Sequence, residues 1–587
     1  MNARRILRRS VPAGAGLLPG SLHPVLRRVY SLRGLHGHEE LDLGLDRLLP
    51  VGTLGGVDHA VARLLDARRG RQRILVVGDF DADGATSTAL VVRQLRRLGF
   101  DDPGFLVPDR FRFGYGLTPE IVRVAAGRSP DLLVTVDNGV SSIEGVAEAR
   151  RCGIDVLITD HHLPGPALPE AAVIVNPNLP GERFGSRALA GVGVAFYVMA
   201  ALTHRLRELG ELPTGAAVNP ADLLDLVALG TVADVVPLDY NNRVLVAQGL
   251  RRIRAGRCVP GIAALLEVAG RRLDTVVAQD LGFQAGPRLN AAGRLEDMTL
   301  GVQCLLTADP VEARALAAQL AQLNSERRDI EARMQGEALA QVDELVASLA
   351  GELPAGLCLH DAGWHQGVIG LVASRVKERL QRPVIAFAPA GDGWIKGSAR
   401  SVPGVHVRDV LDAVAAHHPG LLERFGGHAM AAGMTLPADR LEDFRSAFAT
   451  EVARAAGEGA LSGDLQTDGP LEAGEFNADT AAALREGGPW GSGFPEPAFD
   501  GRFAVLDTRV VGGRHLKLRL RAHSGEVADA IVFRHLDDPQ APAVRPQETV
   551  ELVYRAALDE YGGSRRLQLV TEWLAPPGAA GRGNPAC

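Results

Sequence analysis

Short apolar β-type runs alternate with longer helical patterns from about residue 73 onward. Ile74–Val77, Leu132–Val136 and Val156–Thr159 have the β-branched composition of strands, whereas Ala85–Leu98 and Ser142–Cys152 are rich in helix-forming residues. Strands that alternate with helices pair in parallel, with right-handed crossovers between them. This part of the chain is therefore predicted to be an α/β domain whose strands end at one common edge of a parallel sheet.

Acidic and histidine side chains gather where these apolar runs stop. They are Asp79, Asp81, Asp83, Asp137, Asp160, His161, His162 and Asp234. In open α/β sheets, ligand sites form beyond the carboxyl ends of the strands. Carboxylates crowded at such an edge repel one another unless cations lie between them. Because oxygen and imidazole ligands together suit Mg²⁺ or Mn²⁺, the pattern predicts a divalent metal site for phosphoryl chemistry.

Each of these motifs has a plain structural explanation when it is taken alone. The acid-rich loop before Gly84 could be a capping loop, and Asp137 could cap a turn. Asp234 could be a helix-end acid, because the run before it, Leu223–Leu229, is more helical than strand-like. Asp160-His161-His162 is more specific, since it offers two imidazoles and a carboxylate to orient them. Four such loops in one α/β domain make coincidence improbable.

The remaining sequence predicts several further domains, because 587 residues are too many for one core. Val311–Leu349 reads as one long helix or a helical pair, and a second α/β pattern begins near Gly356. Five short β runs between residues 503 and 574 are separated by glycine-rich turns, which is typical of a small barrel of the OB type. The predicted segments are an N-terminal segment 1–70, an α/β catalytic domain 71–305, a helical connector 306–352, a second α/β domain 353–456, an OB-like β-barrel domain 457–575 and a disordered tail 576–587.

Arginines in segments rich in Gly, Pro or Ser are candidates for phosphate contact. Arg110, Arg288, Arg294 and Arg400 lie in such segments, which we expect to be loops, including a Gly/Ser turn at 397–400 and another loop at 426–428. Arginine suits bidentate contact with phosphate, although a surface salt bridge is the plainer explanation for any one of them. Strand contacts in the barrel domain could come from Arg514, Lys517, Arg519, Arg565 and Arg566. Trp490, Phe494 and Tyr561 could stack on bases or pack in the core.

Composition narrows the class of protein. A hydrophobic fraction of 46% with 23% charged residues is ordinary for a soluble globular protein, and no apolar run has the ~20 residues needed to span a bilayer. The five cysteines are scattered without CxxC spacing, which argues for a reducing cytoplasm and against a zinc site. The net charge of −7 does not by itself indicate a nucleic-acid binder, but net charge is a poor guide to a local groove. Seven arginines and no acid in the first 38 residues could mark a transit peptide, although no clean amphipathic helix precedes Pro12.

The acidic and histidine motifs, taken together and in order, indicate a family. Asp81-Ala82-Asp83-Gly84, Val136–Gly139, Asp160-His161-His162 and Gly230–Asp234 resemble the successive motifs of the DHH phosphoesterase superfamily. The segments that resemble its companion DHHA1 domain are Gly363–Gly370, Gly397–Ser401 and Gly426–Gly433. With the terminal β domain, the chain is similar from about Arg71 to Leu574 to the single-strand-specific exonucleases of this superfamily, with every motif in order.

The resemblance implies a role for each matching residue. One metal ion would have the ligands Asp81 and Asp137. The second would have the ligands Asp83, Asp137, His161 and Asp234. His162 would contact the scissile phosphate, and Asp160 would orient a histidine. Many members carry a histidine four positions before the first motif aspartate, but here that position is Val77. The first metal ion therefore lacks a usual ligand, which Asp79 or water could replace.

In the second lobe the resemblance implies a site for the 5′ end of the strand. The residues that would hold its phosphate or line the cleft are Arg110, Arg288, His365, Arg375, Ser398, Arg400 and His428. The implied activity is stepwise 5′-to-3′ hydrolysis of single-stranded DNA to mononucleotides with two Mg²⁺ or Mn²⁺ ions, in DNA recombination and repair. The expected partners are single-stranded DNA with a 5′ end, a single-stranded-DNA-binding protein and a helicase. We expect a cytoplasmic monomer without membrane contact.

Two alternatives stay open. One is a related enzyme that acts on short oligonucleotides, cyclic dinucleotides or pyrophosphate, and the long connector and terminal barrel argue against so small a substrate. The other is a catalytically silent relative that serves as a binding scaffold. Lost metal ligands would be its signature, and only Val77 departs from the pattern here.

Overall fold

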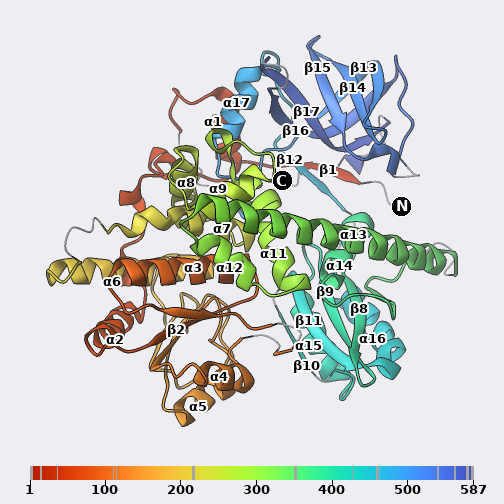
Figure 1. The fold of residues 1–587 in the computed structure, drawn as a ribbon. Helices are drawn as coiled ribbons and strands as arrows, with labels where there is room; N and C mark the ends of the chain where they lie inside the picture. The colour runs from red at the N-terminus through yellow and green to blue at the C-terminus, as the bar shows by residue number, and fades with distance from the viewer. Residues whose placement is uncertain are drawn as a thin grey trace.

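A computed structural model gives the fold of the chain (Figure 1). It describes residues 4–13, 16, 18–35, 37–109, 112–113, 116–213, 218–348, 353–422, 424–427, 429–457, 461, 463–537, 541–560, 564–576 and 581–582, with the backbone alone at 345–348 and 581–582. Among these residues, no helix is both long and apolar enough to cross a membrane. The four described cysteines are free thiols.

The first lobe is built on a five-stranded parallel sheet, as the alternation of strands and helices predicts. Its strand order is β3-β2-β4-β5-β6. The strands are β2 (Ile74–Gly78), β3 (Gly104–Leu106), β4 (Leu132–Val136), β5 (Asp155–Thr159) and β6 (Val173–Val175). The helices around the sheet are α2 (Val57–Arg69), α3 (Ala82–Arg97), α4 (Pro119–Ala126), α5 (Ile143–Arg151) and α6 (Gly191–Glu208). Every residue of β2 and β4 is buried, since helices cover both faces of a parallel sheet.

A group of helices follows the sheet and completes the first lobe. They are α7 (Leu224–Ala233), α8 (Tyr240–Arg254), α9 (Pro260–Glu267), α10 (Ala278–Asp280), a π-helical turn at Leu281–Ala285, α11 (Gly286–Leu295) and α12 (Thr299–Leu306). Arg288 and Arg294 were predicted in loops, and this is wrong, because both lie on α11. The Gly286-Pro287 pair that suggested a loop opens the helix instead, since proline is favoured in the first turn.

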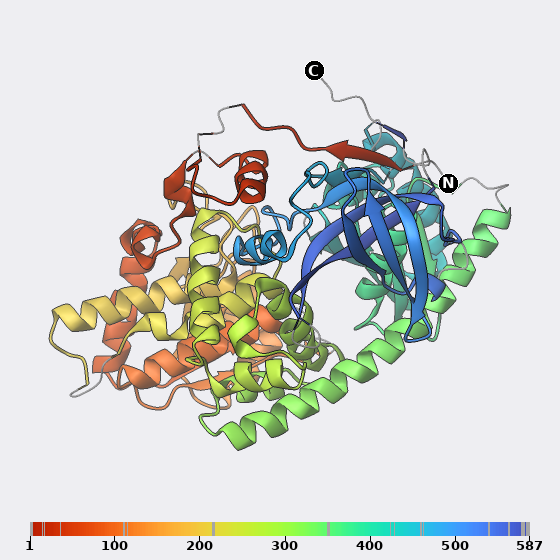
Figure 2. The ribbon, with the colours of Figure 1, turned by 90° about the horizontal axis from the view of Figure 1, so that it is seen from above.

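The long helix α13 (Pro310–Ser348) joins the two lobes and confirms the helix predicted there. Its 39 residues span ~58 Å at 1.5 Å per residue. It packs against α9, α11 and α12 of the first lobe and against α14 (Ile369–Leu380) and β7 (Leu357–His360) of the second. Figure 2 shows it as the long green helix that passes from one lobe to the other.

The second lobe has a mixed sheet with the strand order β10-β11-β9-β8-β7. The remaining elements are β8 (Val384–Gly391), β9 (Trp394–Arg400), α15 (Val407–His417), β10 (Arg424–Gly427), β11 (Ala431–Pro437) and α16 (Leu441–Ala455). The predicted turn at 397–400 is wrong, because it is the end of β9, and Gly426-Gly427 belong to β10 rather than a loop. Glycine is needed at Gly397 because a Cβ there would press against the Phe387 ring.

The last domain is a closed five-stranded barrel of the predicted kind. Its strand order is β13-β14-β15-β17-β16. The elements are β12 (Leu465–Thr467), α17 (Ala478–Glu486), β13 (Phe499–Val511), β14 (His515–Ala522), β15 (Val527–Val532), β16 (Thr549–Asp559) and β17 (Arg566–Ala575). Trp490 and Phe494 are 4% and 5% exposed and stack on each other, which makes them core residues. Tyr561 lies outside the described residues.

The first part of the N-terminal segment packs on the barrel domain, whereas α2 belongs to the first lobe. Strand β1 (Arg5–Arg8) pairs in parallel with β12 on one side and with β18 (Gly581–Arg582) on the other. Two described residues of the tail therefore form a strand where disorder was predicted. The helix α1 (Pro24–Leu32) packs against α17. The N-terminal arginines pair with barrel-side acids, as in Arg5–Asp464 at 2.8 Å and Arg8–Asp500 at 2.7 Å. These contacts give the basic segment a structural role.

One buried carboxyl in α7 makes the stability of the first lobe depend on pH. Asp225 is fully buried, its Oδ2 accepts the Val259 amide at 2.7 Å, and its Oδ1 has no hydrogen-bond partner among the described residues. Burial raises the pKa of Asp225 to about 6. The folded state therefore holds this proton more tightly than the unfolded chain, whose Asp pKa is ~3.9. The stabilisation is complete below that value and is lost as the pH rises through about 6.

We therefore expect Asp225→Asn to gain stability relative to the wild type as the pH rises. The gain in unfolding free energy between pH 5 and pH 8 should be about 1–2 kcal/mol. Chemical denaturation in EDTA, followed by circular dichroism at both pH values, measures it. Asp58→Asn, at an exposed acid of α2, is the control. An equal pH response of Asp225→Asn and the wild type would contradict the prediction.

Candidate metal centre

Asp137 is turned inward by the loop that follows β4. Its φ of +61° lies in the left-handed region, which Asp tolerates better than most residues. The Asn138 side chain donates to the Val77 and Val136 carbonyls at 3.2 and 2.9 Å. The Thr135 hydroxyl donates to the Asn138 carbonyl at 2.8 Å. These bonds fix the turn, and the Asp137 residue is only 1% exposed.

The acidic loop after β2 is ordered by two helix N-termini. Asp81 caps α3, because its Oδ1 accepts the backbone amides of Asp83 and Gly84 at 2.9 and 3.0 Å. The Asp83 carboxylate accepts the first two amides of α6, from Gly191 at 2.6 Å and Val192 at 2.9 Å. Helix N-termini stabilise negative charge. The loop therefore holds its carboxylates in fixed positions although Asp83 is fully buried.

The Asp160-His161-His162 motif follows β5 and is held by its own carboxylate. Asp160 Oδ1 accepts the backbone amides of His161 and His162, and Oδ2 accepts the Val140 amide at 2.9 Å. The same Oδ1 lies 2.8 Å from Nδ1 of His162. Asn178 donates to the His161 carbonyl at 2.6 Å. Asp160 thus fixes the position of the His162 ring, and its role in a reaction stays a prediction.

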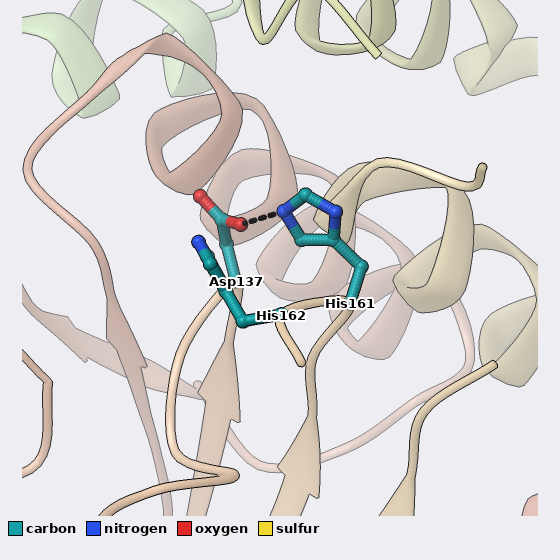
Figure 3. Close-up of side chains that lie close together, drawn as sticks. All are labelled: Asp137, His161 and His162. Carbon is teal, nitrogen blue, oxygen red and sulfur yellow. Dashed lines mark ion pairs between the residues drawn. The ribbon is translucent and has the colours of Figure 1, made fainter. Parts of the chain in front are cut away.

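These loops and the end of α7 bring carboxylate and imidazole groups together. His161 Nε2 lies 3.1 Å from Asp137 Oδ1 and 3.4 Å from Asp234 Oδ2, and Figure 3 shows the first of these contacts. Three sets have ligand atoms within 4.8 Å of one another: Asp79, Asp81 and Asp137; Asp83, His161 and Asp234; and Asp137, His161 and His162. Asp234 is the C-cap of a helix and does not follow a strand, so its helical approach is confirmed.

The electrostatics show that this cluster is built for cations. Burial, followed by the charge of Asp81, raises the pKa of Asp83 to about 7. Burial and the neighbouring carboxylates also raise the pKa values of Asp137 and Asp234 well above their usual range. Asp137 Oδ1 is buried and accepts no hydrogen bond from the described residues. A divalent cation would supply the missing partner, so the donor set fits the metal that the sequence predicts.

His162 differs electrostatically from the ligand carboxylates. Burial alone would lower its pKa, but the hydrogen bond to Asp160 and the nearby carboxylates outweigh burial and raise it to about 9. The same interaction lowers the pKa of Asp160 against the opposing effect of burial. The pair is therefore an imidazolium beside a carboxylate at neutral pH. Such a group can contact a phosphate as a hydrogen-bond donor.

Asp79 lies near the position that the missing histidine at Val77 leaves open. Val77 is fully buried in β2, where its side chain belongs to an apolar cluster. Asp79, two residues later, lies in the same three-atom set as Asp81 and Asp137. The expectation that Asp79 could replace the usual ligand therefore agrees with its position. The candidate set for the first metal ion therefore has three carboxylates and no imidazole.

One end of α11 links the metal cluster to the second lobe. A Cβ at Gly293 would collide with the Phe80 carbonyl in the acidic loop, so the helix backbone touches that loop directly. The next residue, Arg294, donates from Nη1 to the Gly367 carbonyl at 3.0 Å. A Cβ at Gly367 would likewise collide with the Arg294 carbonyl. Adjacent residues of one helix therefore contact a motif of each lobe.

The Ser398–Arg400 pair lies a short way along the same path. Arg400 Nη1 lies 3.0 Å from Ser398 Oγ, both at the end of β9. A Cβ at Gly370, in the first turn of α14, would stand 2.8 Å from Arg400 Nη2 and 2.9 Å from Ser398 Oγ. His365 accepts the Gly367 amide on Nδ1 at 3.1 Å. The expected phosphate-binding residues are thus grouped around the start of α14.

Other expected substrate residues make structural contacts. Arg375 donates to Glu331 of α13 at 3.1 Å and to Glu378 at 3.2 Å, which ties α14 to the long helix. Arg288 is 7% exposed and donates to the Gln284 carbonyl at 2.6 Å. Neither contact tests a role with substrate. Arg110 and His428 lie outside the described residues.

Sequence patterns missed the groups that support the ligands. Asn138, Asn176 and Asn178 hold the ligand loops through their side-chain amides. An asparagine directly after an apolar strand is a weak signal that could have drawn attention to the first. The amides of Gly191 and Val192 carry no side-chain signal at all, since they act through the backbone.

Comparison with known proteins extends these observations over the whole chain. The DHH family N-terminal domain matches residues 73–231, the DHHA1 domain matches 338–454 and the RecJ OB domain matches 467–572. The single-stranded-DNA-specific exonuclease RecJ of Dickeya dadantii (strain 3937) is 53% identical over 579 residues, which cover 98% of this chain and 100% of that protein. The chain belongs to the RecJ family. RecJ of Escherichia coli (strain K12) is 50% identical over 97% of this chain and 99% of its own length.

Solved structures of the RecJ family share this fold. The crystal structure of RecJ from Thermus thermophilus in complex with Mn²⁺ superimposes with a TM-score of 0.77 at 31% identity. The match covers 96% of this chain and 78% of that one. The Mg²⁺ complex of the same protein gives a TM-score of 0.72 at 30% identity, over 96% of this chain and 76% of that one. The order of lobes, connector and barrel is therefore that of RecJ.

We expect Asp79→Asn to weaken Mn²⁺ binding at the three-carboxylate set while the second set still binds. The loss in affinity should reach at least the ~10–100-fold seen when a supporting residue of a metal site is removed. Isothermal titration of the metal-free protein measures it. Asp58→Asn, far from the cluster on α2, should bind like the wild type. Two unchanged sites in Asp79→Asn would show that Asp79 is no ligand.

Proposed function

We propose that this chain is a single-stranded-DNA-specific exonuclease that removes 5′-mononucleotides in the 5′-to-3′ direction. The observation that carries the proposal is the buried, cation-deficient cluster around Asp137, joined through α11 to the Ser398–Arg400 pair. A metal centre alone would serve many phosphoesterases. A phosphate-binding pair beside it favours an enzyme that recognises the end of a strand.

In this proposal, two groups of residues in the chain would each hold one metal ion. Asp79, Asp81 and Asp137 would hold one divalent ion, and Asp83, Asp137, His161 and Asp234 would hold the other. When bound, two such ions polarise the phosphate and activate water for in-line attack. Mn²⁺ and Mg²⁺ are supported by the donor set and by the metals named for the Thermus structures.

His162 and Asp160 act on the phosphate rather than on a metal ion. The imidazolium, held by the 2.8 Å contact with Asp160, would donate a hydrogen bond to a phosphate oxygen. Its charge would stabilise the negative charge that develops as the phosphodiester bond breaks. Asp160 is buried and fully bonded to backbone amides and to His162, so it serves as the orienting group.

Recognition of the 5′ end would come from the second lobe. Arg400 offers a planar set of donors that matches a terminal phosphate, and Ser398 adds a hydroxyl. Because α14 begins against this pair, its N-terminal dipole also favours an anion there. A free 5′-phosphate has more charge than an internal one, which supports a preference for strand ends. Recombination and repair are the processes in which such ends arise.

A digestion of end-labelled DNA tests the activity. The wild type with Mn²⁺ or Mg²⁺ should release labelled mononucleotides from 5′-labelled single strands and leave duplex DNA intact. Asp137→Ala should lower the rate by a factor of at least about 10³, because it removes a carboxylate shared by both metal sets. Asp58→Asn is the matched control. Persistent release by Asp137→Ala, or a preference for dinucleotides over long strands, would refute the proposal.

End recognition has a separate test. Arg400→Gln should slow digestion of 5′-phosphorylated strands by about 10–100-fold, which corresponds to the loss of a charge-assisted contact. Strands with a 5′-hydroxyl should be affected much less. Rates measured side by side on the two substrates give the ratio. An equal effect on both would mean that Arg400 does not read the 5′-phosphate.

Finer expectations from the sequence remain predictions. These are the cytoplasmic location, the monomeric state, and the contacts with a single-stranded-DNA-binding protein and a helicase. Among the barrel cations, Arg514 and Lys517 already pair with Asp537 and Asp529. Arg519 and Arg566 are exposed and are the better candidates for strand contact.

A further inference from the structure

A basic cavity lies away from the metal cluster, where four distant parts of the chain meet. Its volume is about 250 Å³. Its walls come from α1 and the turn after it, from one side of α8, from the start of α10, and from the end of α17 with the segment that follows it. Figure 1 places α1, α8 and α17 together on the barrel side of the first lobe. The ligands of the metal cluster are absent from its lining.

Positive charge dominates the polar part of this cavity. Its charged lining residues are Arg243, Arg251, Arg254, Arg485, Glu40 and Glu486. Arg485 already pairs with Glu560 at 3.1 Å, and the other three guanidinium groups face two carboxylates. Burial, and next the neighbouring guanidinium of Arg485, lower the pKa of Arg254. Cations this close repel one another, and an anion among them would relieve that repulsion.

Arg243 is the member that most needs an anionic partner. It is only 6% exposed, and it forms no ion pair with any described residue. Its guanidinium lies 4.4 Å from the centroid of the Phe494 ring, and its one hydrogen bond to a described residue is a 3.4 Å contact with the Glu40 carbonyl. A buried charge without a counter-ion is costly. The cation–π contact offsets part of this cost.

The apolar part of the lining would accept a flat organic group. Leu22, Leu41 and Val277 are half-buried side chains on its walls, and Trp490 and Phe494 lie beneath them. The cavity is slightly smaller than the ~300–1,000 Å³ of drug-sized ligand sites. The cavity therefore has room for one small anion with an apolar body. A longer nucleic-acid strand would have to extend out of it.

We propose that this cavity is a second binding site for a nucleoside 5′-monophosphate, separate from the metal centre. Its arginines would hold the phosphate, and its apolar wall would hold the base or sugar. The choice of a nucleotide rests on the proposed function, because that reaction releases nucleotides of this kind. The phosphate-binding character rests on the arginines alone.

The position of the cavity also connects it to the metal ligands. Asn242, beside Arg243 on α8, donates to the Ala188 carbonyl at 2.6 Å and to the Pro237 carbonyl at 2.9 Å. Ala188 lies three residues before Gly191, whose amide holds Asp83, and Pro237 lies three residues after Asp234. A nucleotide bound against α8 would therefore contact the helix whose Asn242 side chain holds the two segments that carry ligands of the second metal set.

Calorimetric titration of the full chain in EDTA tests the proposal. EDTA removes cations that would let a phosphate bind at the metal centre, so a failed nuclease assay and a failed titration remain distinguishable. Deoxyadenosine 5′-monophosphate should bind, and Arg400→Gln, which removes the other proposed phosphate contact, should retain this binding. Arg251→Gln with Arg254→Gln should weaken that binding by about 10–100-fold, as expected for lost charge-assisted bonds. Asp137→Ala should bind like the wild type.

The ligand class is tested with three further probes. Inorganic phosphate and deoxyadenosine should each bind more weakly than the nucleotide. Equal binding of either probe would overturn the assignment to a nucleotide. A short oligothymidylate that binds more tightly than the nucleotide, and loses affinity in the arginine variants, would overturn it in favour of a strand path. Absence of saturable nucleotide binding at millimolar concentration in a folded wild type would also overturn it.

Discussion

Repulsion among buried carboxylates is the constraint that shapes the first lobe. Three aspartates at the cluster have raised pKa values, because burial and their neighbours oppose ionisation. Such an arrangement persists only if the surrounding fold determines it strongly. The parallel sheet supplies this rigidity, since its strand ends are fixed by hydrogen bonds on both sides. Helix N-termini and asparagine amides then hold each carboxylate in place. The fold thus holds buried carboxylates whose mutual repulsion divalent cations would relieve.

Features that depend on local sequence patterns could be predicted from the sequence. The strands, their acidic ends and the long helix follow local patterns of hydrophobicity, so they were predicted closely. The order of the motifs identified the superfamily, and the DHH and DHHA1 matches agree with it. Even the substitution at Val77 pointed to Asp79, which the structure places with Asp81 and Asp137.

The predictions from the sequence were wrong where a glycine or proline has a role in tertiary packing. The local sequence at Gly397 predicts a turn, but this residue lies in β9, where the Phe387 ring occupies the space that a side chain would need. Pro287 likewise suggests a loop, but it lies in the first turn of α11. The bridge from Gly293 and Arg294 to Gly367 could not be predicted, because it joins residues more than 70 positions apart through backbone contact. Such contacts between distant parts of the chain leave no signal in the local sequence pattern.

The pairing of β1 has a consequence for how the protein is made. Residues 5–8 find their partners at 465–467 and 581–582, so the first strand leaves the ribosome long before the segments that it must join exist. During synthesis its arginines have no barrel-side acids to pair with. Contacts this distant in sequence form slowly, and lobes fold in order from the N-terminus. The pairing of β1 with both neighbours is therefore completed only at the end of synthesis, and a chain truncated before residue 581 would leave one edge of β1 unpaired.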